Sequence, residues 1–302
     1  MPDAFPQECS EPKCIFTIDV EDWFHILNLP STPPLSEWDR LPSRVDRNFL
    51  GLLDLLSEYG AQATCFFLGW VAERFPHLVR EASSRGHEIA SHGYAHKLVF
   101  HMQRDEFRED ALRARGILEQ ISGAPVLGYR AAGFSVIEGT SWFFRELECA
   151  GYAYDSSVFP ATRGHGGFHS ASRAPHRVSG TERLVEFPVS VADTFGKPLC
   201  FFGGGYLRLF PTWLILKKSR EVLCEHRPVV FYVHPREIDP GHPRLPMNLR
   251  RRFKSYVNLT QTEDKLRKIL MAFPMMTFAE YLKQTKAQLA HVSDDAYVAS
   301  AV

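Results

Sequence analysis

VDRNFLGLLDLLSEYGAQATCFFLG, residues 45–69, joins a stretch of helical periodicity to a short apolar run through Gly60. A glycine at such a place typically closes a helix in a left-handed conformation, and a short apolar run after it is typical of a buried parallel strand. The same order recurs at Gly86, followed by HEIASH, and at Gly151, followed by YAYDSS. The repetition predicts helices alternating with strands.

Other segments extend this alternation along the chain. Further strands are expected at 15–20, 126–129, 184–189, 229–233 and 275–278, and helices at 70–85, 104–121, 142–150, 211–224 and 262–271. Alternating elements imply an α/β fold with a parallel sheet, and seven or eight such units favour closure into a barrel. In such barrels the chemistry lies at the carboxyl ends of the strands.

Composition narrows the class of protein. The 302 residues include 35 Lys and Arg against 35 Asp and Glu, with 45% hydrophobic and 13% aromatic residues. A high aromatic content together with a net charge of zero excludes a disordered chain. The chain has no excess of basic residues, which argues against a nucleic-acid partner. No apolar run approaches the ~20 residues of a membrane-spanning helix, so no transmembrane segment is expected.

The start of the chain and its cysteines predict a location. Residues 1–13 carry acids and prolines where a signal peptide would carry a basic and then an apolar segment. The six cysteines are scattered and form no CxxC pair. Reduced thiols and no export signal favour a cytoplasmic protein.

Two long Pro/Gly/Ser-rich loops, 28–43 and 160–181, interrupt the alternation and are expected to shape substrate access. We expect an N-terminal tail over 1–13, one barrel domain over 14–290 and a frayed tail over 291–302.

Polar residues follow the predicted strands at their ends. They are Asp19, Asp22, His92, Arg130, Asp155 and His234. Because the carboxyl ends of parallel strands meet at one edge of the sheet, these side chains are expected to converge.

SHGYAH places His92 and His96 four residues apart, so that on a helical turn both imidazoles face one metal ion. A catalytic metal site with two histidines needs a carboxylate ligand and an open position for water. FTIDVEDWFH offers Asp19, Glu21 and Asp22 at the end of the first strand. Three acids so close together repel one another unless a cation neutralises them.

Two further residues complete the chemistry. Arg130, in GYRAAGFS, is suited to fixing a neighbouring carboxylate through a bidentate pair. His234 follows five apolar residues in VVFYVHPRE, and Pro235 ends the strand there. An activated water, a carboxylate base and a histidine acid are the equipment for hydrolysing an amide or ester.

The chain resembles the NodB-homology polysaccharide deacetylases, carbohydrate esterase family 4. The resemblance rests on TIDVED, SHGYAH, YRAAG, YDSS and VHP, in the family's order from Phe16 to His234. It implies a distorted (β/α)7 barrel, a divalent metal that is usually Zn²⁺, and an N-acetylated saccharide as substrate. The same ligands would also hold Co²⁺, Ni²⁺ or Fe²⁺.

The downstream sequence resembles a subgroup associated with exosortase-type exopolysaccharide loci. The resemblance lies in GGGYLRLFP and HPREIDPGHPRLPMNLRRRFKSYVNL and implies a family-specific extension over about 235–285. Members of this subgroup are thought to modify a cell-surface polysaccharide or its precursor, either a polymer or a lipid-linked intermediate.

Carried over residue by residue, the resemblance makes Asp19 the general base, held by Arg130, and His234 the general acid. His92 and His96 become metal ligands. The common motif has two adjacent aspartates, but Val20 occupies the second place here, so the carboxylate ligand is Glu21 or Asp22. The Asp-x-Asp spacing of imide-hydrolase relatives favours Glu21. The shorter Asp22 lies nearer the turn, and we lean toward it.

Sugar contacts are expected from Trp23, Phe24 and Tyr206 by stacking, and from Asp155, which the fourth motif retains. The glycines at 203–205 either bring backbone close to substrate or form a sharp turn.

The sequence therefore predicts metal-dependent removal of acetyl groups from an N-acetylated sugar. The alternatives are hydrolysis of a cyclic imide or small amide, and a catalytically silent carbohydrate-binding barrel. A non-haem iron oxygenase also uses two histidines and a carboxylate, but its usual antiparallel barrel disagrees with the alternation of strands and helices.

Overall fold

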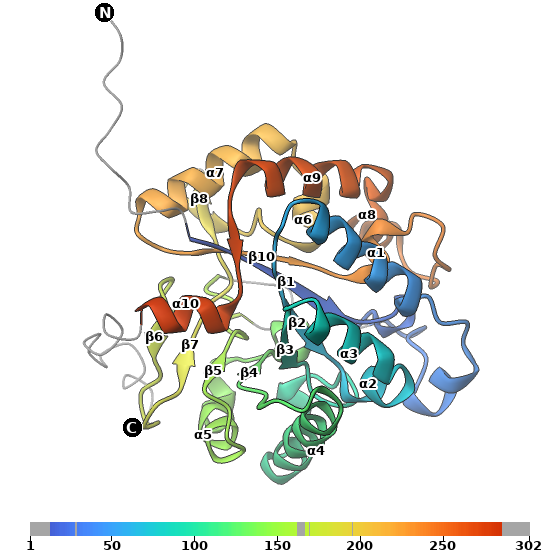
Figure 1. Ribbon diagram of the computed structural model, residues 1–302, viewed down its shortest axis with the longest axis vertical. Coiled ribbons are helices and arrows are strands. Elements are labelled where there is room, and N and C mark those ends of the chain that lie inside the picture. The colour runs from blue at the N-terminus through green and yellow to red at the C-terminus, as the bar shows by residue number, and fades with distance from the viewer. Residues whose placement is uncertain (1–12, 28, 162–166, 169, 195, 286–302) are drawn as a thin grey trace, which may run out of the picture.

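The computed structural model describes residues 13–27, 29–161, 167–168, 170–194 and 196–285. A curled sheet forms its centre, and helices cover the outside (Figure 1). Its parallel strands are β1 (Cys14–Val20), β2 (Thr64–Phe67), β3 (Glu88–Ser91), β4 (Gly128–Tyr129), β5 (Tyr154–Asp155), β7 (Val185–Glu186), β10 (Val229–Val233) and β11 (Met275–Met276). β6 (His176–Arg177) runs antiparallel to β7, and β8 (Ala192–Thr194) pairs with β9 (Lys197–Leu199) in a separate hairpin.

The strand order is β10-β1-β2-β3-β4-β5-β7-β6, with β11 beside the start of β1. The predicted α/β class and the distorted barrel are confirmed, and each strand expected from the sequence is present, most of them shorter than expected. In the described residues no strand pairing joins the two ends of this order, so the sheet curls without closing.

The helices follow the predicted alternation with one break. Pro76 splits the helix expected over 70–85 into two, because a proline removes an amide donor and clashes with the preceding turn. The α-helices are α1 (Val45–Glu58), α2 (Gly69–Arg74), α3 (Pro76–Ser84), α4 (Arg104–Ser122), α5 (Trp142–Cys149), α6 (Gly204–Leu209), α7 (Thr212–Cys224), α8 (Leu249–Tyr256), α9 (Thr262–Ala272) and α10 (Phe278–Thr285).

Short 3₁₀ helices occupy several connections. They are η1 (Trp23–His25), η2 (Leu35–Arg40), η3 (Val99–His101), η4 (Ala132–Phe134), η5 (Glu138–Thr140), η6 (Pro235–Ile238) and η7 (Leu259–Gln261). The loop expected over 28–43 thus contains η2, and the loop expected over 160–181 contains β6. Apart from Lys13, the tail expected over 1–13 lies outside the described residues, and so does the tail expected over 291–302.

The alternation of side chains along β1 separates core from site. Phe16, Ile18 and Val20 pack into the main hydrophobic core, and Ile15 joins a second apolar cluster inside the curled sheet. Thr17 and Asp19 share the inner face with Ile15, because successive strand residues point to opposite sides. The inner face is therefore apolar at the start of β1 and polar at its carboxyl end.

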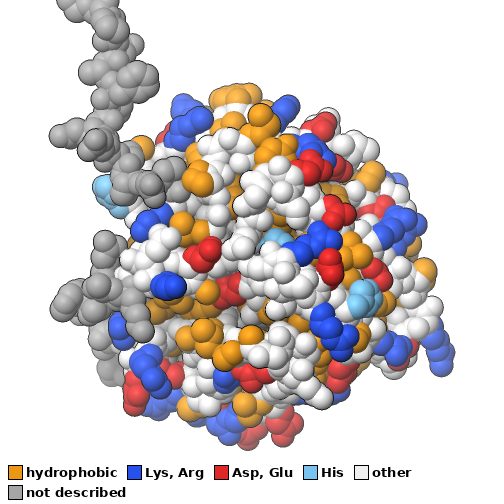
Figure 2. All heavy atoms as spheres, in the orientation of Figure 1, with side chains coloured by type: hydrophobic (Ala, Val, Ile, Leu, Met, Phe, Trp, Pro, Cys, Tyr) orange, Lys and Arg blue, Asp and Glu red, His pale blue; other side chains and the backbone are white. Residues whose placement is uncertain are grey.

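On the face of the molecule shown in Figure 2, acidic and basic side chains are interspersed, as expected of a neutral chain. No helix of the described residues combines the length and apolar character needed to cross a membrane.

Candidate active site

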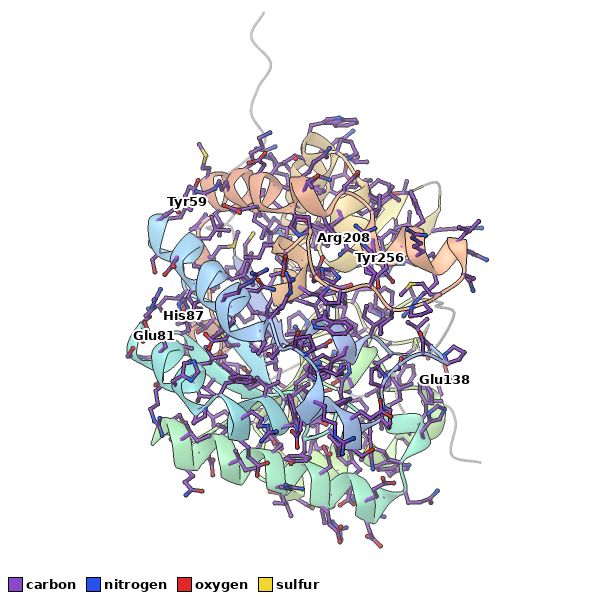
Figure 3. The ribbon with its side chains drawn as sticks, turned by 90° about the vertical axis from the view of Figure 1, so that its right-hand side faces the viewer. Tyr59, Glu81, His87, Glu138, Arg208 and Tyr256 are labelled. Carbon is purple, nitrogen blue, oxygen red and sulfur yellow. The ribbon has the colours of Figure 1, made fainter. Side chains whose placement is uncertain are left out.

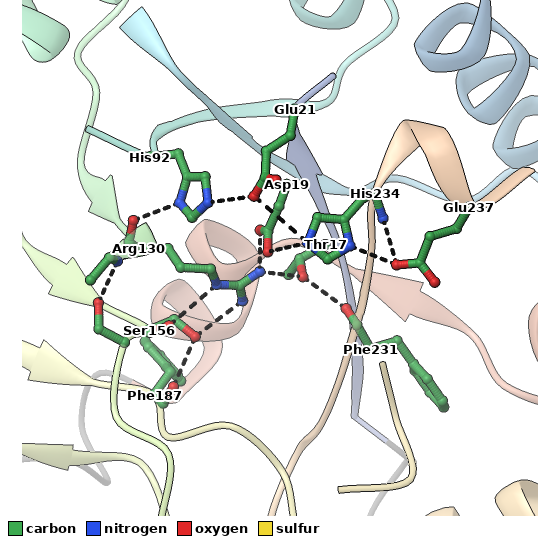
Figure 4. A network of polar contacts seen from close by, with 12 residues as sticks. Thr17, Asp19, Glu21, His92, Arg130, Ser156, Phe187, Phe231, His234 and Glu237 are labelled. Atoms are coloured by element: carbon green, nitrogen blue, oxygen red, sulfur yellow. Dashed lines mark hydrogen bonds and ion pairs between the residues drawn. The ribbon is translucent and has the colours of Figure 1, made fainter. Parts of the chain in front are cut away.

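Glu21, His92 and His96 form a buried cluster of metal-ligand atoms at the carboxyl ends of β1 and β3. Figure 4 shows Glu21 and His92 of this cluster. Glu21 Oε1 lies 3.1 Å from His92 Nε2 and 2.9 Å from His96 Nε2. Burial disfavours the charge on Glu21, but the neighbouring histidines outweigh it and hold the pKa of this carboxyl well below its usual range. One ionised carboxylate thus faces two imidazoles in a site shielded from solvent.

The orientation of His92 fits a metal ligand. Its Nδ1 lies 2.7 Å from the Arg130 carbonyl oxygen, which only accepts hydrogen bonds, so Nδ1 carries the hydrogen. In the neutral ring Nε2 then presents its lone pair to Glu21. Lone pairs of a histidine and a carboxylate facing each other at this distance are stabilised by a cation between them, so the donor set fits a divalent metal.

The turn that carries both histidines is irregular rather than helical, which corrects the helical turn expected from their spacing. Amide groups of α2 fasten it: Gly69 donates to the Gly93 carbonyl and Trp70 to the Tyr94 carbonyl. His96 itself has a left-handed backbone, with φ 52°. Non-glycine residues rarely adopt this conformation, and such strain is typical of functional sites.

Asp22 does not join the cluster, so the lean toward Asp22 as the carboxylate ligand does not fit the structure. Its carboxylate caps η1 and accepts hydrogen bonds from the Trp23, Arg44 and Val45 amides and from the Ser43 hydroxyl. These four donors fix it toward the backbone of the following loop. Glu21, rather than Asp22, lies within reach of both His92 and His96.

Asp19 lies beside the cluster and is held from behind by Arg130. Arg130 Nη1 donates to Asp19 Oδ1 at 2.7 Å and to Thr17 Oγ1 at 2.8 Å. Its other nitrogens donate to the Ser156 carbonyl and hydroxyl oxygens, and the guanidinium lies 4.1 Å from the Phe66 ring centre. With Arg130 fully buried and its donors occupied, one oxygen of Asp19 is fixed and the other faces the cavity.

His234 lies on the other side of the cluster. Its Nε2 is 3.7 Å from Glu21 Oε1 and 3.9 Å from Asp19 Oδ2. Its Nδ1 donates to Glu237 Oε1 at 2.6 Å, and Arg208 Nη1 lies 3.1 Å from the other oxygen of Glu237. Although burial opposes it, the Arg208 charge and the contact with His234 lower the pKa of Glu237 to about 2. An ionised carboxylate therefore orients the imidazole.

Three of the residues expected to contact sugar are buried. Trp23 is 6% exposed, and its indole donates to the Pro42 carbonyl. Asp155 is fully buried, accepts from the Ser157 hydroxyl and lies against Glu186. Both side chains support the site from behind, so neither is placed to meet a substrate. Phe24, also fully buried, packs against Trp70.

Asp155 and Glu186 form a coupled acid pair beneath the site. Burial raises the pKa of Asp155 to about 6, and burial together with the Asp155 charge raises the pKa of Glu186 well above its usual range. The pair thus holds a proton to higher pH than an isolated carboxyl group would.

A cavity of about 1180 Å³ opens over the cluster. Asp19, Glu21, His96 and His234 line its floor, and Tyr206 lies at its mouth, 39% exposed. The predicted position of Tyr206 near substrate fits this placement.

The glycines of 203–205 bring α6 close to its neighbours, and Gly204 and Gly205 also line the cavity. A side chain at Gly203 would meet the Tyr232 ring at 2.2 Å, and one at Gly205 would meet the Lys254 carbonyl at 2.7 Å. These positions need glycine for packing.

Sequence reasoning missed three residues at the site. Glu237 follows His234 by three positions, and this spacing in HPRE was its available signal. His25 Nδ1 accepts from the Asp22 amide, so Nε2 carries the hydrogen; it has no hydrogen-bond partner in the described structure, and the ring lines the cavity. Arg208, in YLRLFP, has no local pattern that indicates its role.

Comparison with known proteins matches this geometry to a family. Residues 37–148 match the polysaccharide deacetylase family model. The chain thus carries a polysaccharide deacetylase domain. Residues 156–283 match a domain of unknown function, DUF3473. The deacetylase match contains His92, His96 and Arg130, whereas His234 and Glu237 lie in the DUF3473 segment, so the two segments build the cavity jointly.

A curated relative matches part of the chain. A peptidoglycan-N-acetylglucosamine deacetylase from Bacillus cereus is 35% identical over 72 residues, which are 24% of this chain and 26% of the relative. The chain thus matches about a quarter of that relative's length.

Two solved structures share the fold. One is a structure from Mycobacterium smegmatis that carries the name polysaccharide deacetylase. Its TM-score is 0.63 at 21% identity, and the match covers 95% of this chain and 94% of that chain. The other is PuuE allantoinase (TM-score 0.60, 16% identity, 96% and 100%).

Proposed function

We propose that this protein is a metal-dependent deacetylase that removes acetyl groups from N-acetylated sugars. One observation carries the proposal: a carboxylate, Asp19, and an imidazole, His234, flank the Glu21/His92/His96 cluster on the floor of one cavity. A base, an acid and a metal-ligand set in this arrangement supply what amide hydrolysis requires.

Glu21, His92 and His96 would hold the divalent cation. When bound, such a cation lowers the pKa of water toward ~7 and polarises a carbonyl oxygen. Asp19 is placed to accept the proton of the attacking water, since Arg130 fixes one of its oxygens and leaves the other facing the cluster. Arg130 holds this carboxylate in one orientation.

His234 is placed to protonate the departing sugar nitrogen, because an amine leaves poorly as an anion. Glu237 holds Nδ1, so Nε2 is the nitrogen that faces the cavity and donates the proton. His25 Nε2–H is a further donor near the cluster, with its ring centre 5.9 Å from that of His96.

The substrate and setting belong to the same proposal. We assign the sugar to a cell-surface polysaccharide or its precursor, on the resemblance of the downstream sequence to the exosortase-associated subgroup, and the metal to Zn²⁺. The name of the Bacillus cereus relative supports an N-acetylglucosamine unit. The described cysteines are free thiols, which supports a cytoplasmic setting.

The test measures acetate release from N-acetylated oligosaccharides with Zn²⁺-loaded protein, alongside metal content. Asp19→Asn is expected to lower kcat about 10²- to 10⁴-fold while retaining metal, and His92→Ala to lose both metal and activity. His77→Ala, an exposed histidine on α3, is the matched control. Hydrolysis of a small cyclic imide without acetate release, or sugar binding without turnover, would refute the proposal.

A further inference from the structure

An apolar and basic rim surrounds part of the cavity mouth. It consists of residues from α6 and α8 that all line the same cavity as the candidate active site: Tyr206, Leu209, Leu249, Arg250, Phe253 and Lys254. Arg208, buried between the helices, ties them by donating to the Lys254 carbonyl at 2.9 Å. Figure 3 shows Arg208 close to Tyr256 of α8.

The apolar members of the rim are exposed to an unusual degree. Leu249 is 81% exposed, Phe253 55% and Leu209 41%. Leu249 and Phe253 lie one turn apart on α8, so their side chains are neighbours. Large exposed apolar groups gathered at one place mark a surface that contacts another apolar phase or molecule.

The stretch of sequence that contains α8 carries Arg and Lys but no acidic residue. Residues 240–262 contain no Asp or Glu but hold Arg244, Arg250, Arg251, Arg252 and Lys254, within a chain whose net charge is zero. Arg250, Arg252 and Lys254 are exposed. Among the residues that the structure describes, no carboxylate forms an ion pair with Arg250 or Lys254.

We propose that the α6–α8 rim docks on an anionic lipid surface and turns the cavity mouth toward it. Exposed Leu and Phe beside clustered Arg and Lys on a helix are the signature of insertion at a lipid interface. A soluble acidic polysaccharide would match the charges but leaves Leu249 and Leu209 without a partner. The proposal extends the proposed function, because a sugar joined to a lipid would then meet Asp19 and His234 at the membrane.

Vesicle sedimentation tests the docking separately from catalysis. The protein is expected to sediment with vesicles of phosphatidylglycerol and phosphatidylcholine but not of phosphatidylcholine alone, and to be released by raised salt. Arg250→Gln with Lys254→Gln should weaken vesicle affinity roughly fivefold for each charge removed. Leu249→Ser with Phe253→Ser should weaken it by a similar or larger factor.

Matched controls lie on the opposite side of the molecule. Leu112→Ser on α4 and Arg145→Gln on α5 change an exposed leucine and an exposed arginine far from α8 in Figure 1, and should leave vesicle binding unchanged. The His92→Ala protein should still bind vesicles, so a failure of the deacetylase proposal leaves docking measurable, and acetate release from soluble sugars tests catalysis without lipid.

Three results would overturn docking. One is equal binding to neutral and anionic vesicles or to neither. Another is tight binding of dextran sulfate that Leu249→Ser with Phe253→Ser does not alter, together with no vesicle binding. The last is a dimer in analytical ultracentrifugation that the same double variant dissociates, since a second copy would then cover the rim.

Discussion

Glu237 accepts a hydrogen bond from His234 Nδ1 at 2.6 Å and thereby aims Nε2 of that ring at the cavity. The carboxylate is fully buried, and its other oxygen faces the Arg208 guanidinium. The Arg208 charge and the contact with His234 lower its pKa to about 2, so it stays ionised at neutral pH. The orientation of the proposed acid depends on a group that does not itself titrate in the working range.

Glu237→Gln is expected to lower kcat by about 10²-fold, because the amide keeps the shape of the carboxylate but removes the charge that stabilises a protonated His234. Metal content should not change. The measurement is kcat for acetate release across pH, with Glu225→Gln, an exposed acid near the end of α7, as the control. Full activity in Glu237→Gln would show that His234 acts without this partner.

Substitutions of the adjacent acids Glu21 and Asp22 should differ in their effects on metal content and on the free energy of unfolding. Glu21→Ala should lose bound metal, since Glu21 supplies the carboxylate oxygen between the two histidines. Asp22→Ala should retain metal but lower the free energy of unfolding by about 1–2 kcal/mol, because the Asp22 carboxylate no longer accepts hydrogen bonds at the start of η1 and from residues 43–45 at the start of α1. Metal analysis and thermal unfolding on the same samples decide the point; loss of metal in Asp22→Ala alone would reverse the assignment.

Glu186→Gln should flatten the dependence of stability on pH. In the native protein the pKa of Glu186 is raised, so its contribution to stability is greatest below its ordinary pKa and is lost as pH rises through the folded value. The wild type is therefore expected to lose stability with rising pH, and the variant, which has no proton to lose there, to lose less. Urea unfolding in EDTA between pH 6 and 9 measures both slopes. Parallel slopes would show that the acid pair is not coupled to folding.

Asp239→Asn should lower stability at neutral pH and leave it unchanged in acid. Asp239 pairs with Arg44 at 2.9 Å and Arg47 at 2.8 Å, fastening η6 to α1. Opposing the effect of burial, these partners lower its pKa to about 2. Its contribution, about 2 kcal/mol, is present above the ordinary Asp pKa and disappears as pH falls through about 2. Unfolding at pH 7 and at pH 1.5, below the folded pKa, checks the difference; an equal loss at both would assign it to packing.

The sequence predicted the α/β alternation because each buried strand is a short apolar run and glycines mark several of the helix ends. It also indicated the residues at the cavity floor, since the carboxyl ends of parallel strands share one edge of the sheet. Asp155 and Trp23 lie at or just after the ends of strands, but this position did not place them in the cavity. Asp155 is buried against Glu186, and Trp23 is buried against the loop at Pro42.

The other features that the sequence did not predict depend on long-range packing. Gly205 lets α6 lie close to the Lys254 carbonyl of α8, and Gly203 lets the start of α6 lie close to Tyr232 of β10. Arg208 of α6 contacts Glu237 and the Lys254 carbonyl. No local periodicity indicates contacts of this kind, so the sequence predicted neither the rim nor the place of Arg208.

Thr17, Asp19 and Glu21 alternate with the core residues Ile18 and Val20 along a single backbone. The register of the hydrogen bonds that β1 makes with β10 and β2 therefore sets the positions of Asp19 and Glu21. A slip of one residue would bury both acids in hydrocarbon and expose the aliphatic side chains to the cavity. When β1 pairs in its correct register, the acids of the candidate active site are therefore placed at the same time.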